Sequence, residues 1–185
     1  LGMRFDDRVT GKLSAYARQA KIMHIEVDPS EIDKIVKADY PVLGDAKNVL
    51  KKLIPLIKKN THKEWVQEFK DAYEIEYEKV IKNDIYRNNG KISMGEAVRI
   101  ASEKTNGNAI CVTDVGQQQM IASRYFKFNQ TKSMVTSGGL GTMGFGLPAA
   151  VGAQMGRPDR TVIAFIGDGG FQMTMQEMGT IAQEN

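Results

Sequence analysis

The sequence predicts an α/β protein whose parallel sheets are covered by helices on both faces. Continuous apolar segments of strand length alternate with segments in which apolar residues keep helical spacing. Strands that are apolar on both sides are typical of parallel sheets buried between two layers of helices. We expect such strands at 22–27, 109–113, 134–136 and 161–166.

Residues 1–57 are predicted to be the closing strand and helices of one α/β domain. After the first strand, the turn at 28–31 has a proline and an acidic residue where a helix would begin, and the apolar residues after it keep helical spacing up to Val36. Asp45 is expected to cap a second helix with one apolar face.

Residues 58–90 are predicted to form a linker dominated by one helix. Its first part, 58–82, carries four aromatic side chains among six lysines and six acidic residues. Aromatic and basic residues together are typical of single-stranded nucleic-acid binding, but equal numbers of opposite charges leave no positive field. We therefore expect an amphipathic helix with an aromatic packing face.

A second α/β unit is expected over residues 91–185. Ser93 and Glu96 have the spacing of a capping box and predict a helix that ends before Asn106. A helix of small residues is expected between the last two strands, after Pro148. The alternation of strands and helices predicts a parallel sheet in this unit.

The composition is that of a globular protein, with 42% hydrophobic and 25% charged residues among 185. The net charge of +3 is too small to indicate a nucleic-acid or membrane partner, and no apolar stretch approaches the roughly 20 residues that cross a bilayer. The lone cysteine, Cys111, cannot form an internal disulfide, so a reducing, cytoplasmic location is expected. Because the chain lacks an initiator methionine and ends within an expected helix, we expect a piece of a longer protein.

Three turns at the ends of expected strands carry the chemistry, because ligands of open α/β sheets bind at the carboxyl ends of the strands. The first turn is Gly167-Asp168-Gly169-Gly170. Its glycines let the backbone approach a phosphate closely, and the Asp168 carboxylate is the hard oxygen ligand that Mg²⁺ prefers. Taken alone, this motif is equally a common turn after a strand.

The second turn, residues 137–148, has five glycines in nine residues. The missing side chains would let a flat ring lie against the main chain. The stretch also carries Leu140, Met143, Phe145 and Leu147, which are unlike the residues of a solvated linker. A buried cofactor cleft and a flexible surface loop are the two interpretations.

The third turn is Asp114-Val115-Gly116-Gln117-Gln118-Gln119. Its amide side chains can hydrogen-bond a phosphate or a ring without adding charge. The same residues equally fit a simple helix start after a strand.

Together, the run 136–150 and the Gly167-Asp168-Gly169 turn resemble the diphosphate-binding domain of thiamine-diphosphate enzymes. Among these enzymes the chain is most similar to the catalytic (large) subunits of the acetolactate synthase (acetohydroxyacid synthase) family, because residues 4–11 resemble the segment of their middle domain that lines an FAD site. The resemblance implies the tail of a Rossmann-like, FAD-binding middle domain at 1–57, a linker helix at 58–90, and a truncated thiamine-diphosphate-binding fold at 91–185.

The resemblance also implies individual roles. Asp168 would be a Mg²⁺ ligand, and Gly169 and Gly170 would contact the diphosphate. The carbonyl of Gly141 would accept a hydrogen bond from the aminopyrimidine, and Met143 would be the apolar wedge that bends the cofactor and so prepositions its base. The residues implied for thiamine diphosphate are Gln117, Gln118, Gly141, Thr142, Met143, Asp168, Gly169 and Gly170. Those implied for FAD are Gly2, Met3, Arg4, Phe5, Asp6, Asp7, Glu26, Val27, Asp45 and Ala46.

The implied activity is a transferase reaction that begins branched-chain amino acid biosynthesis (valine, isoleucine, leucine). Pyruvate is decarboxylated on thiamine diphosphate, and the hydroxyethyl carbanion condenses with a second 2-oxo acid, pyruvate or 2-oxobutanoate, to give 2-acetolactate or 2-aceto-2-hydroxybutyrate. Thiamine diphosphate, Mg²⁺ and FAD are the implied cofactors, with FAD not consumed. A homodimer or homotetramer and a regulatory small subunit are the implied assemblies.

Two features separate the chain from the family pattern. Gln118 stands where the family usually has histidine, so it can donate a hydrogen bond but carries no proton or charge at neutral pH. The family's activating glutamate and its second metal ligand, an asparagine, belong to segments outside these residues. We therefore expect the isolated 185 residues to be inactive.

Two other functions stay open on the sequence. One is another thiamine-diphosphate enzyme, such as a 2-oxo acid decarboxylase or a glyoxylate carboligase, against which residues 4–11 argue. The other is a non-catalytic nucleotide- or phosphate-binding module that uses residues 167–170 as an anion nest.

Overall fold

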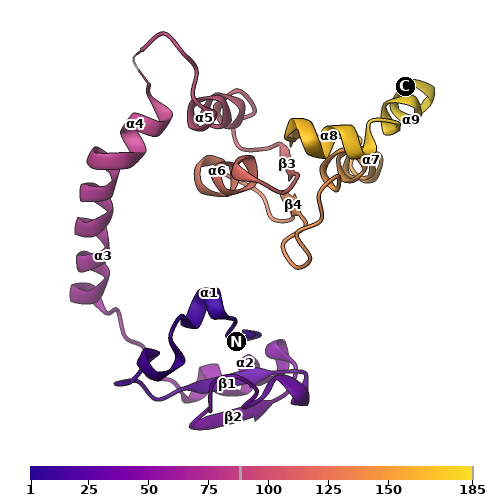
Figure 1. Ribbon diagram of the computed structural model, residues 1–185. Coiled ribbons are helices and arrows are strands. Elements are labelled where there is room, and N and C mark those ends of the chain that lie inside the picture. Colours follow the sequence, from indigo (N-terminus) through magenta and orange to yellow (C-terminus); the bar gives the residue numbers. More distant parts are fainter. Residues whose placement is uncertain (88, 185) are drawn as a thin grey trace. The chain divides into compact units, whose positions relative to one another are not determined.

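The computed structural model describes residues 1–87 and 89–184, and the chain divides into two compact units, Leu1–Lys63 and Glu64–Asn185. Asn185, where the sequence predicts a helix in progress, lies outside the described residues. Each unit contains its own parallel sheet (Figure 1). The prediction of an α/β protein with parallel sheets is therefore confirmed.

The first unit is a two-stranded parallel sheet with short helices. Its elements are α1 (Asp7–Thr10), the 3₁₀ turn η1 (Leu13–Ala15), β1 (Met23–Glu26), the 3₁₀ turn η2 (Pro29–Glu31), β2 (Tyr40–Leu43), α2 (Ala46–Leu53) and the 3₁₀ turn η3 (Ile54–Leu56). Strand β1 confirms the predicted first strand, and Asp45 caps α2 as expected, because its side chain accepts a hydrogen bond from the Asn48 amide at 3.0 Å.

One expectation for this unit is wrong, and one strand was not predicted. The helix predicted after Pro29 is only the single turn η2, because Asp33 has a positive φ of 58° and its carboxylate accepts the Ala38 amide at 2.8 Å, which closes a turn instead. Strand β2 was not predicted. Its pairing with β1, which matches Met23 with Tyr40, joins residues far apart in the sequence.

The second unit contains a three-stranded parallel sheet with helices. Its elements are α3 (Lys63–Glu76), a π-helical segment (Tyr77–Ile81), α4 (Lys82–Ile85), α5 (Met94–Lys104), β3 (Ile110–Thr113), α6 (Gln117–Tyr125), β4 (Met134–Thr136), α7 (Gly146–Gly156), β5 (Val162–Phe165), α8 (Asp168–Thr174) and α9 (Glu177–Glu184). The three strands predicted here and the small-residue helix α7 are confirmed.

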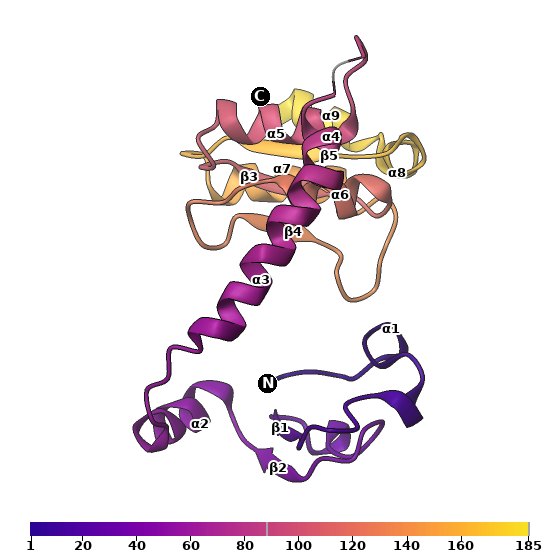
Figure 2. The same cartoon turned by 90° about the vertical axis from the view of Figure 1, so that its left-hand side faces the viewer.

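Strand β3 is the centre of this sheet, whose order is β4-β3-β5, as the stacked strands in Figure 2 show. Helices cover both faces, with α5 and α6 on one side of the strands and α7 and α8 on the other (Figure 1). The central strand is completely buried; Cys111 and Val112 are 0% exposed. Its core neighbours include Val98 of α5 and Ala122 of α6.

The predicted linker helix is observed as α3, continued by the π-helical segment and α4. Its last part packs against the sheet unit, because the Tyr125 hydroxyl donates to the Asp84 carboxylate at 2.5 Å. Burial, and the nearby Asp84, raise the pKa of Tyr125 to about 12. The predicted cap of α5 is also present, since the Ser93 hydroxyl accepts the Glu96 amide at 3.1 Å.

Within the part of the chain that the structure describes, no helix combines the length and the apolar character needed to cross a membrane.

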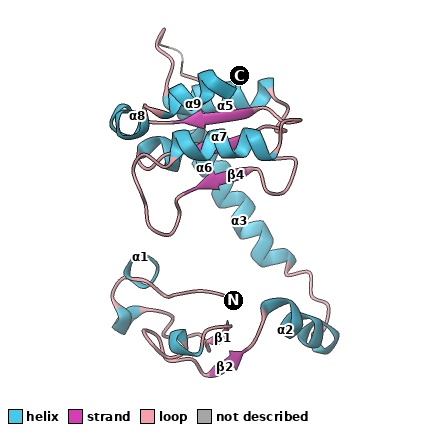
Figure 3. Ribbon diagram, turned by 90° about the vertical axis from the view of Figure 1, so that its right-hand side faces the viewer, coloured by secondary structure: helices cyan, strands magenta, loops and turns pink. Residues whose placement is uncertain are grey.

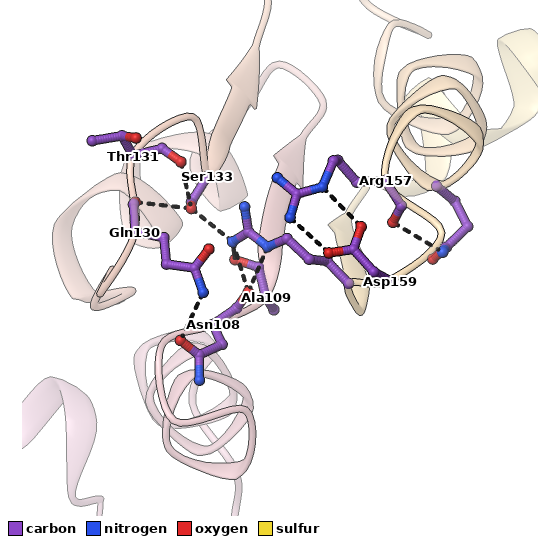
Figure 4. Close-up of polar contacts among 9 residues, drawn as sticks. Asn108, Ala109, Gln130, Thr131, Ser133, Arg157 and Asp159 are labelled. Carbon is purple, nitrogen blue, oxygen red and sulfur yellow. Dashed lines mark hydrogen bonds and ion pairs between the residues drawn. The ribbon is translucent and has the colours of Figure 1, made fainter.

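The amino-terminal edge of the second sheet is tied together by the buried side chain of Arg160. Its guanidinium donates to the Asn108 carbonyl at 2.6 and 2.9 Å, to the Ala109 carbonyl at 3.2 Å and to the Ser133 hydroxyl at 2.8 Å (Figure 4). Asn108 and Ala109 precede β3, and Ser133 precedes β4. One side chain from the loop before β5 therefore joins the starts of all three strands.

We predict that Arg160→Met lowers the free energy of unfolding by about 2–4 kcal/mol, because the buried carbonyls lose charged donors that water cannot replace. Urea denaturation followed by circular dichroism measures the change. The matched control is Arg157→Met. Arg157 pairs with exposed Asp159 beside the same loop, and its loss should leave stability within error. Equal effects of the two substitutions would contradict the role given to Arg160.

The buried thiol of Cys111 gives a second prediction. Burial raises the pKa of this thiol from its ordinary value of 9.0 to about 11, so it is protonated at pH 8. We expect Ellman's reagent to react on the order of 100-fold more slowly with the native chain than with the urea-unfolded chain. Because the thiol ionises more readily when unfolded, it should also lower stability as the pH rises from about 9 toward 11. A native thiol that reacts as fast as the unfolded one would refute this.

Candidate functional site

Three loops leave the second sheet at one edge, because its three strands are parallel. Asp114 directly follows β3, Ser137 follows β4, and Gly167 follows β5. Figure 3 shows the strands pointing the same way, with α8 and the loop between β4 and α7 at the end marked by the arrowheads. The fold therefore brings the three predicted motifs to one place.

The glycine-rich loop is folded by hydrogen bonds to its first residue. The Ser137 carbonyl accepts the Gly141 amide at 3.1 Å, and the Ser137 hydroxyl accepts the Thr142 amide at 3.0 Å. Gly141 has a φ of +63°, a left-handed conformation that favours glycine. The apolar tip of the loop is exposed, with Leu140 at 93% and Met143 at 50%. An exposed apolar tip beside a strand-end loop is a surface that a partly apolar ligand can cover.

The carboxylate of Asp114 holds the other end of this loop. It is fully buried, and it accepts the amides of Gly144 at 3.2 Å, Gly146 at 2.7 Å and its own neighbour Val115 at 2.8 Å. Asp114 opens the third predicted turn, in which ligand contacts were expected only from the amide side chains. An acidic residue directly after a buried strand was the available signal. The hydrogen-bond partners of its carboxylate could not be predicted from the sequence, because Gly144 and Gly146 lie 30 and 32 residues further along the chain.

The loop after β5 packs directly against the other two. A Cβ atom at Gly170 would lie 2.7 Å from the Asp114 carboxylate, so the site excludes any side chain there. At Gly169, a Cβ atom would meet only the Met143 methyl group, at an ordinary contact distance of 3.5 Å. Met143 therefore lies beside Gly169, and two separate sequence motifs meet at that point.

Asp168 is the first residue of α8 and its side chain is exposed at this edge. A single exposed carboxylate fits one ligand position of Mg²⁺, which takes oxygen ligands and completes its shell with water or phosphate. Among residues 1–87 and 89–184, no cluster of three or more acidic, histidine or cysteine side chains could hold a metal unaided.

The glutamines after β3 take three different positions. Gln117 begins α6 and is exposed, whereas the Gln118 side chain donates to the Val115 carbonyl at 3.2 Å. The Gln118 amide group also lies against Gly167, at 3.4 Å from the position of a Cβ atom there. The Gln119 amide donates to the Thr136 hydroxyl at 2.8 Å and so links α6 to β4. Gln118 thus lies between the ends of β3 and β5.

The residues predicted for FAD all belong to the first unit. Glu26 and Val27 stand at the carboxyl end of β1, and Asp45 and Ala46 follow β2. Because β1 and β2 are parallel, both pairs lie at one edge of the small sheet, where nucleotides bind in such folds. The Glu26 carboxylate accepts the Val27 amide at 2.8 Å, which fixes it at that edge.

The segment 2–7 is attached to the same sheet. The Gly2 amide donates to the Ile25 carbonyl at 2.9 Å, and Asp6 caps α1 by accepting the Val9 amide at 3.2 Å. Phe5 is 7% exposed and its ring packs edge-on against His24, with centroids 4.9 Å apart. The Phe5 side chain therefore belongs to the core of the unit.

Comparison with protein families agrees with this arrangement. The family description "Thiamine pyrophosphate enzyme, C-terminal TPP binding domain" matches residues 114–185, and "Thiamine pyrophosphate enzyme, central domain" matches residues 1–53. Thiamine pyrophosphate is the same cofactor as thiamine diphosphate. The chain belongs to the thiamine pyrophosphate enzymes.

Within that class, the chain is similar over its whole length to acetolactate synthase large subunits. It is 42% identical to that of Buchnera aphidicola (from Schizaphis graminum), covering 100% of this chain and 32% of the relative. Identity is also 42% with the Lactococcus lactis subunit, over 98% of this chain and 31% of the relative, and 40% with the Escherichia coli isozyme 3 subunit, over 99% and 32%. The chain thus spans about a third of the length of these relatives. The resemblance inferred from the motifs is confirmed.

The packing of the last loop yields a prediction with a built-in control. Gly170→Ala should lower the free energy of unfolding by about 1–3 kcal/mol, because the added methyl group would lie 2.7 Å from the Asp114 carboxylate. Gly169→Ala should leave stability unchanged or raise it by up to ~1 kcal/mol, since its methyl group finds ordinary contact within a helix. Urea denaturation of both variants tests this. Equal stability of the two variants would show that the carboxylate does not occupy the space assigned to it.

Proposed function

We propose that this chain is part of an acetolactate synthase catalytic subunit. The reaction is the transfer of the two-carbon unit of pyruvate, with loss of CO₂, to a second pyruvate or to 2-oxobutanoate. The observation that supports it most is the meeting of Met143 with Gly169 at the carboxyl edge of the second sheet, beside the carboxylate of Asp168. Identity of about 40% with acetolactate synthase large subunits over the whole chain supports the specific reaction.

The second unit would hold thiamine diphosphate, which supplies the electron sink for decarboxylation when bound. Gly141 would offer its carbonyl to the aminopyrimidine, and the half-exposed Met143 would support the bend of the cofactor. Gly169 and Gly170 would contact the diphosphate. Gln117, Gln118 and Thr142 would line the remaining surface. The exposed apolar loop tip supports this assignment, since a bound ring would remove it from water.

Asp168 would bind Mg²⁺, with further ligands supplied by the diphosphate and by residues outside this chain. Its role is to hold the diphosphate charge, because a divalent cation neutralises phosphate oxygens. The exposed position of Asp168 at the start of α8 supports this.

The first unit would border FAD, in a role outside the reaction itself. Gly2, Met3, Arg4, Asp6 and Asp7 would contact it through the segment attached to β1, and Phe5 through its main chain. Glu26, Val27, Asp45 and Ala46 would lie near its adenosine part. The shared edge of β1 and β2 supports this placement.

The larger assembly is part of the same proposal. We take residues 1–57 as the end of the middle domain, 58–90 as the linker and 91–185 as the start of the cofactor domain. The complete subunit would form a homodimer or homotetramer, with a regulatory small subunit as a further partner, and would work in the cytoplasm. The term "large subunit" in the relatives' names supports the small subunit.

The decisive experiment uses the full-length parent protein with pyruvate, thiamine diphosphate and Mg²⁺, with and without FAD. We expect acetolactate as the product and a requirement for all three cofactors. Acetaldehyde as the product would assign the protein to the 2-oxo acid decarboxylases. Turnover without FAD would remove the role given to residues 2–7. The isolated 185-residue chain should form no acetolactate.

We further predict that Asp168→Asn in the parent protein weakens Mg²⁺-dependent binding of thiamine diphosphate by about 100-fold or more, since a neutral amide oxygen attracts a divalent cation less strongly than a carboxylate does. Isothermal titration calorimetry at fixed Mg²⁺ measures the affinity. Asp159→Asn is the control. It makes the same chemical change at an exposed aspartate that forms an ion pair with Arg157. Unchanged affinity in Asp168→Asn would overturn the metal assignment.

A further inference from the structure

We propose that Asp114 is the positioning residue of this site: its buried carboxylate sets the glycine-rich loop, and with it Met143, against the first turn of α8. The consequence for catalysis rests on the function proposed above, whereas the positioning itself is a property of the fold. Asp114 would not touch the reacting atoms. It would act through the loop that does.

The carboxylate is itself held firmly. Asp114 follows the central strand β3, and its own amide donates to the Phe165 carbonyl of β5 at 3.0 Å. Its side chain is 0% exposed. A short side chain on a paired, buried backbone has little freedom, so the positions of its two oxygens follow from the sheet.

Both oxygens are used by main-chain donors. Oδ1 accepts the amides of Val115 and Gly144, and Oδ2 accepts the amide of Gly146. This pattern requires two acceptors. An asparagine of the same shape would present an NH₂ group to at least one of these N–H donors, which leaves a buried donor unpaired.

The held amides are next to the functional residues. Gly144 directly follows Met143, and its carbonyl accepts the Thr174 hydroxyl of α8 at 3.1 Å. Met143 in turn lies against Gly169. The Asp114 carboxylate thus fixes the main chain directly after Met143. Helix α8 contacts the Met143 side chain through Gly169 and holds the Gly144 carbonyl through Thr174.

The spacing of the two loops depends on the same group. A Cβ atom at Gly146 would lie 3.0 Å from Asp114, and one at Gly170 would lie 2.7 Å from the carboxylate. The backbone at Gly170 lies closer to Asp114 than a side chain allows, and at Gly146 a side chain would be crowded. The distance between the loop of Met143 and the turn of Asp168 is therefore set by one carboxylate between them.

The first test needs neither cofactor nor activity. In the full-length parent protein, hydrogen–deuterium exchange with single-residue resolution should show the amides of Gly144 and Gly146 protected at least tenfold over that of Gly139, which lies in the same loop. Asp114→Asn should accelerate exchange of Gly144 or Gly146 at least tenfold and leave β3 and β5 unchanged. Asp159→Asn, the same change at an exposed aspartate, should alter neither.

The second test concerns catalysis. Asp114→Asn should lower kcat for acetolactate formation at least tenfold and change KM for pyruvate less than threefold, because a displaced Met143 affects the reacting geometry more than substrate access. A parent protein that makes no acetolactate would refute the proposed function and leave the exchange test standing. Active parent protein with an unchanged kcat in Asp114→Asn would refute the catalytic part of this inference.

The exchange measurement tests the proposal even if Asp114→Asn does not fold, because the unmodified protein alone can contradict it. If Gly144 and Gly146 in the unmodified protein exchange as fast as Gly139, the positioning role is wrong without any substitution. Acceleration throughout β3 and β5 in Asp114→Asn would likewise overturn it, since it would show a general loss of stability in place of a local release of the loop.

Discussion

The acceptance of three main-chain amides by the buried carboxylate of Asp114 is the interaction on which the candidate site depends. A charged group is costly to bury unless donors surround it, and the amides that lie next to it on the glycine-rich loop provide them. The same amides would otherwise be buried without partners, because a loop that leaves a sheet has lost the pairing of the strands. The carboxylate and the loop therefore require each other. This mutual requirement explains how an irregular stretch so rich in glycine keeps one conformation.

The two edges of the second sheet are stabilised by opposite charges for one physical reason. At the amino-terminal edge, Arg160 donates to carbonyls of the loops before β3 and to Ser133 before β4. At the carboxyl-terminal edge, Asp114 accepts amides of the loop before α7. In each case a buried ion satisfies main-chain groups that the strands leave unpaired. The central strand β3 is fixed at both ends, and it provides a rigid base for the exposed loop tip at Leu140 and Met143.

The sequence predicts well whatever depends on neighbours along the chain. The strands of the second unit, the cap of α5 at Ser93 and the cap of α2 at Asp45 each follow from a few adjacent residues. The helix expected after Pro29 fails because Asp33 closes a turn with Ala38, an interaction that competes with helical hydrogen bonds and leaves no periodic signal. The pairing of β2 and the partners of Asp114 were beyond prediction because they join distant segments. The motifs thus located the site, but the group that organises it became visible only in three dimensions.

The glycines of the site serve two different purposes, which a motif cannot separate. At Gly170, Asp114 leaves no room for a Cβ atom, and at Gly146 a Cβ atom would be crowded at 3.0 Å from the same residue. At Gly141, in contrast, a Cβ atom would meet nothing within 4 Å, and the residue is favoured only by its φ of +63°. At Gly169 the only neighbour is the Met143 methyl group. The first pair is thus required by the fold itself. At Gly141 the fold requires the backbone conformation of glycine but not the absence of a side chain, and at Gly169 it requires neither. The open space beside Gly141 is therefore what a ligand would use. Gly146, which packs against Asp114, lies at the buried base of the loop, whereas Gly141 lies at its exposed tip. A cofactor would lie against that tip.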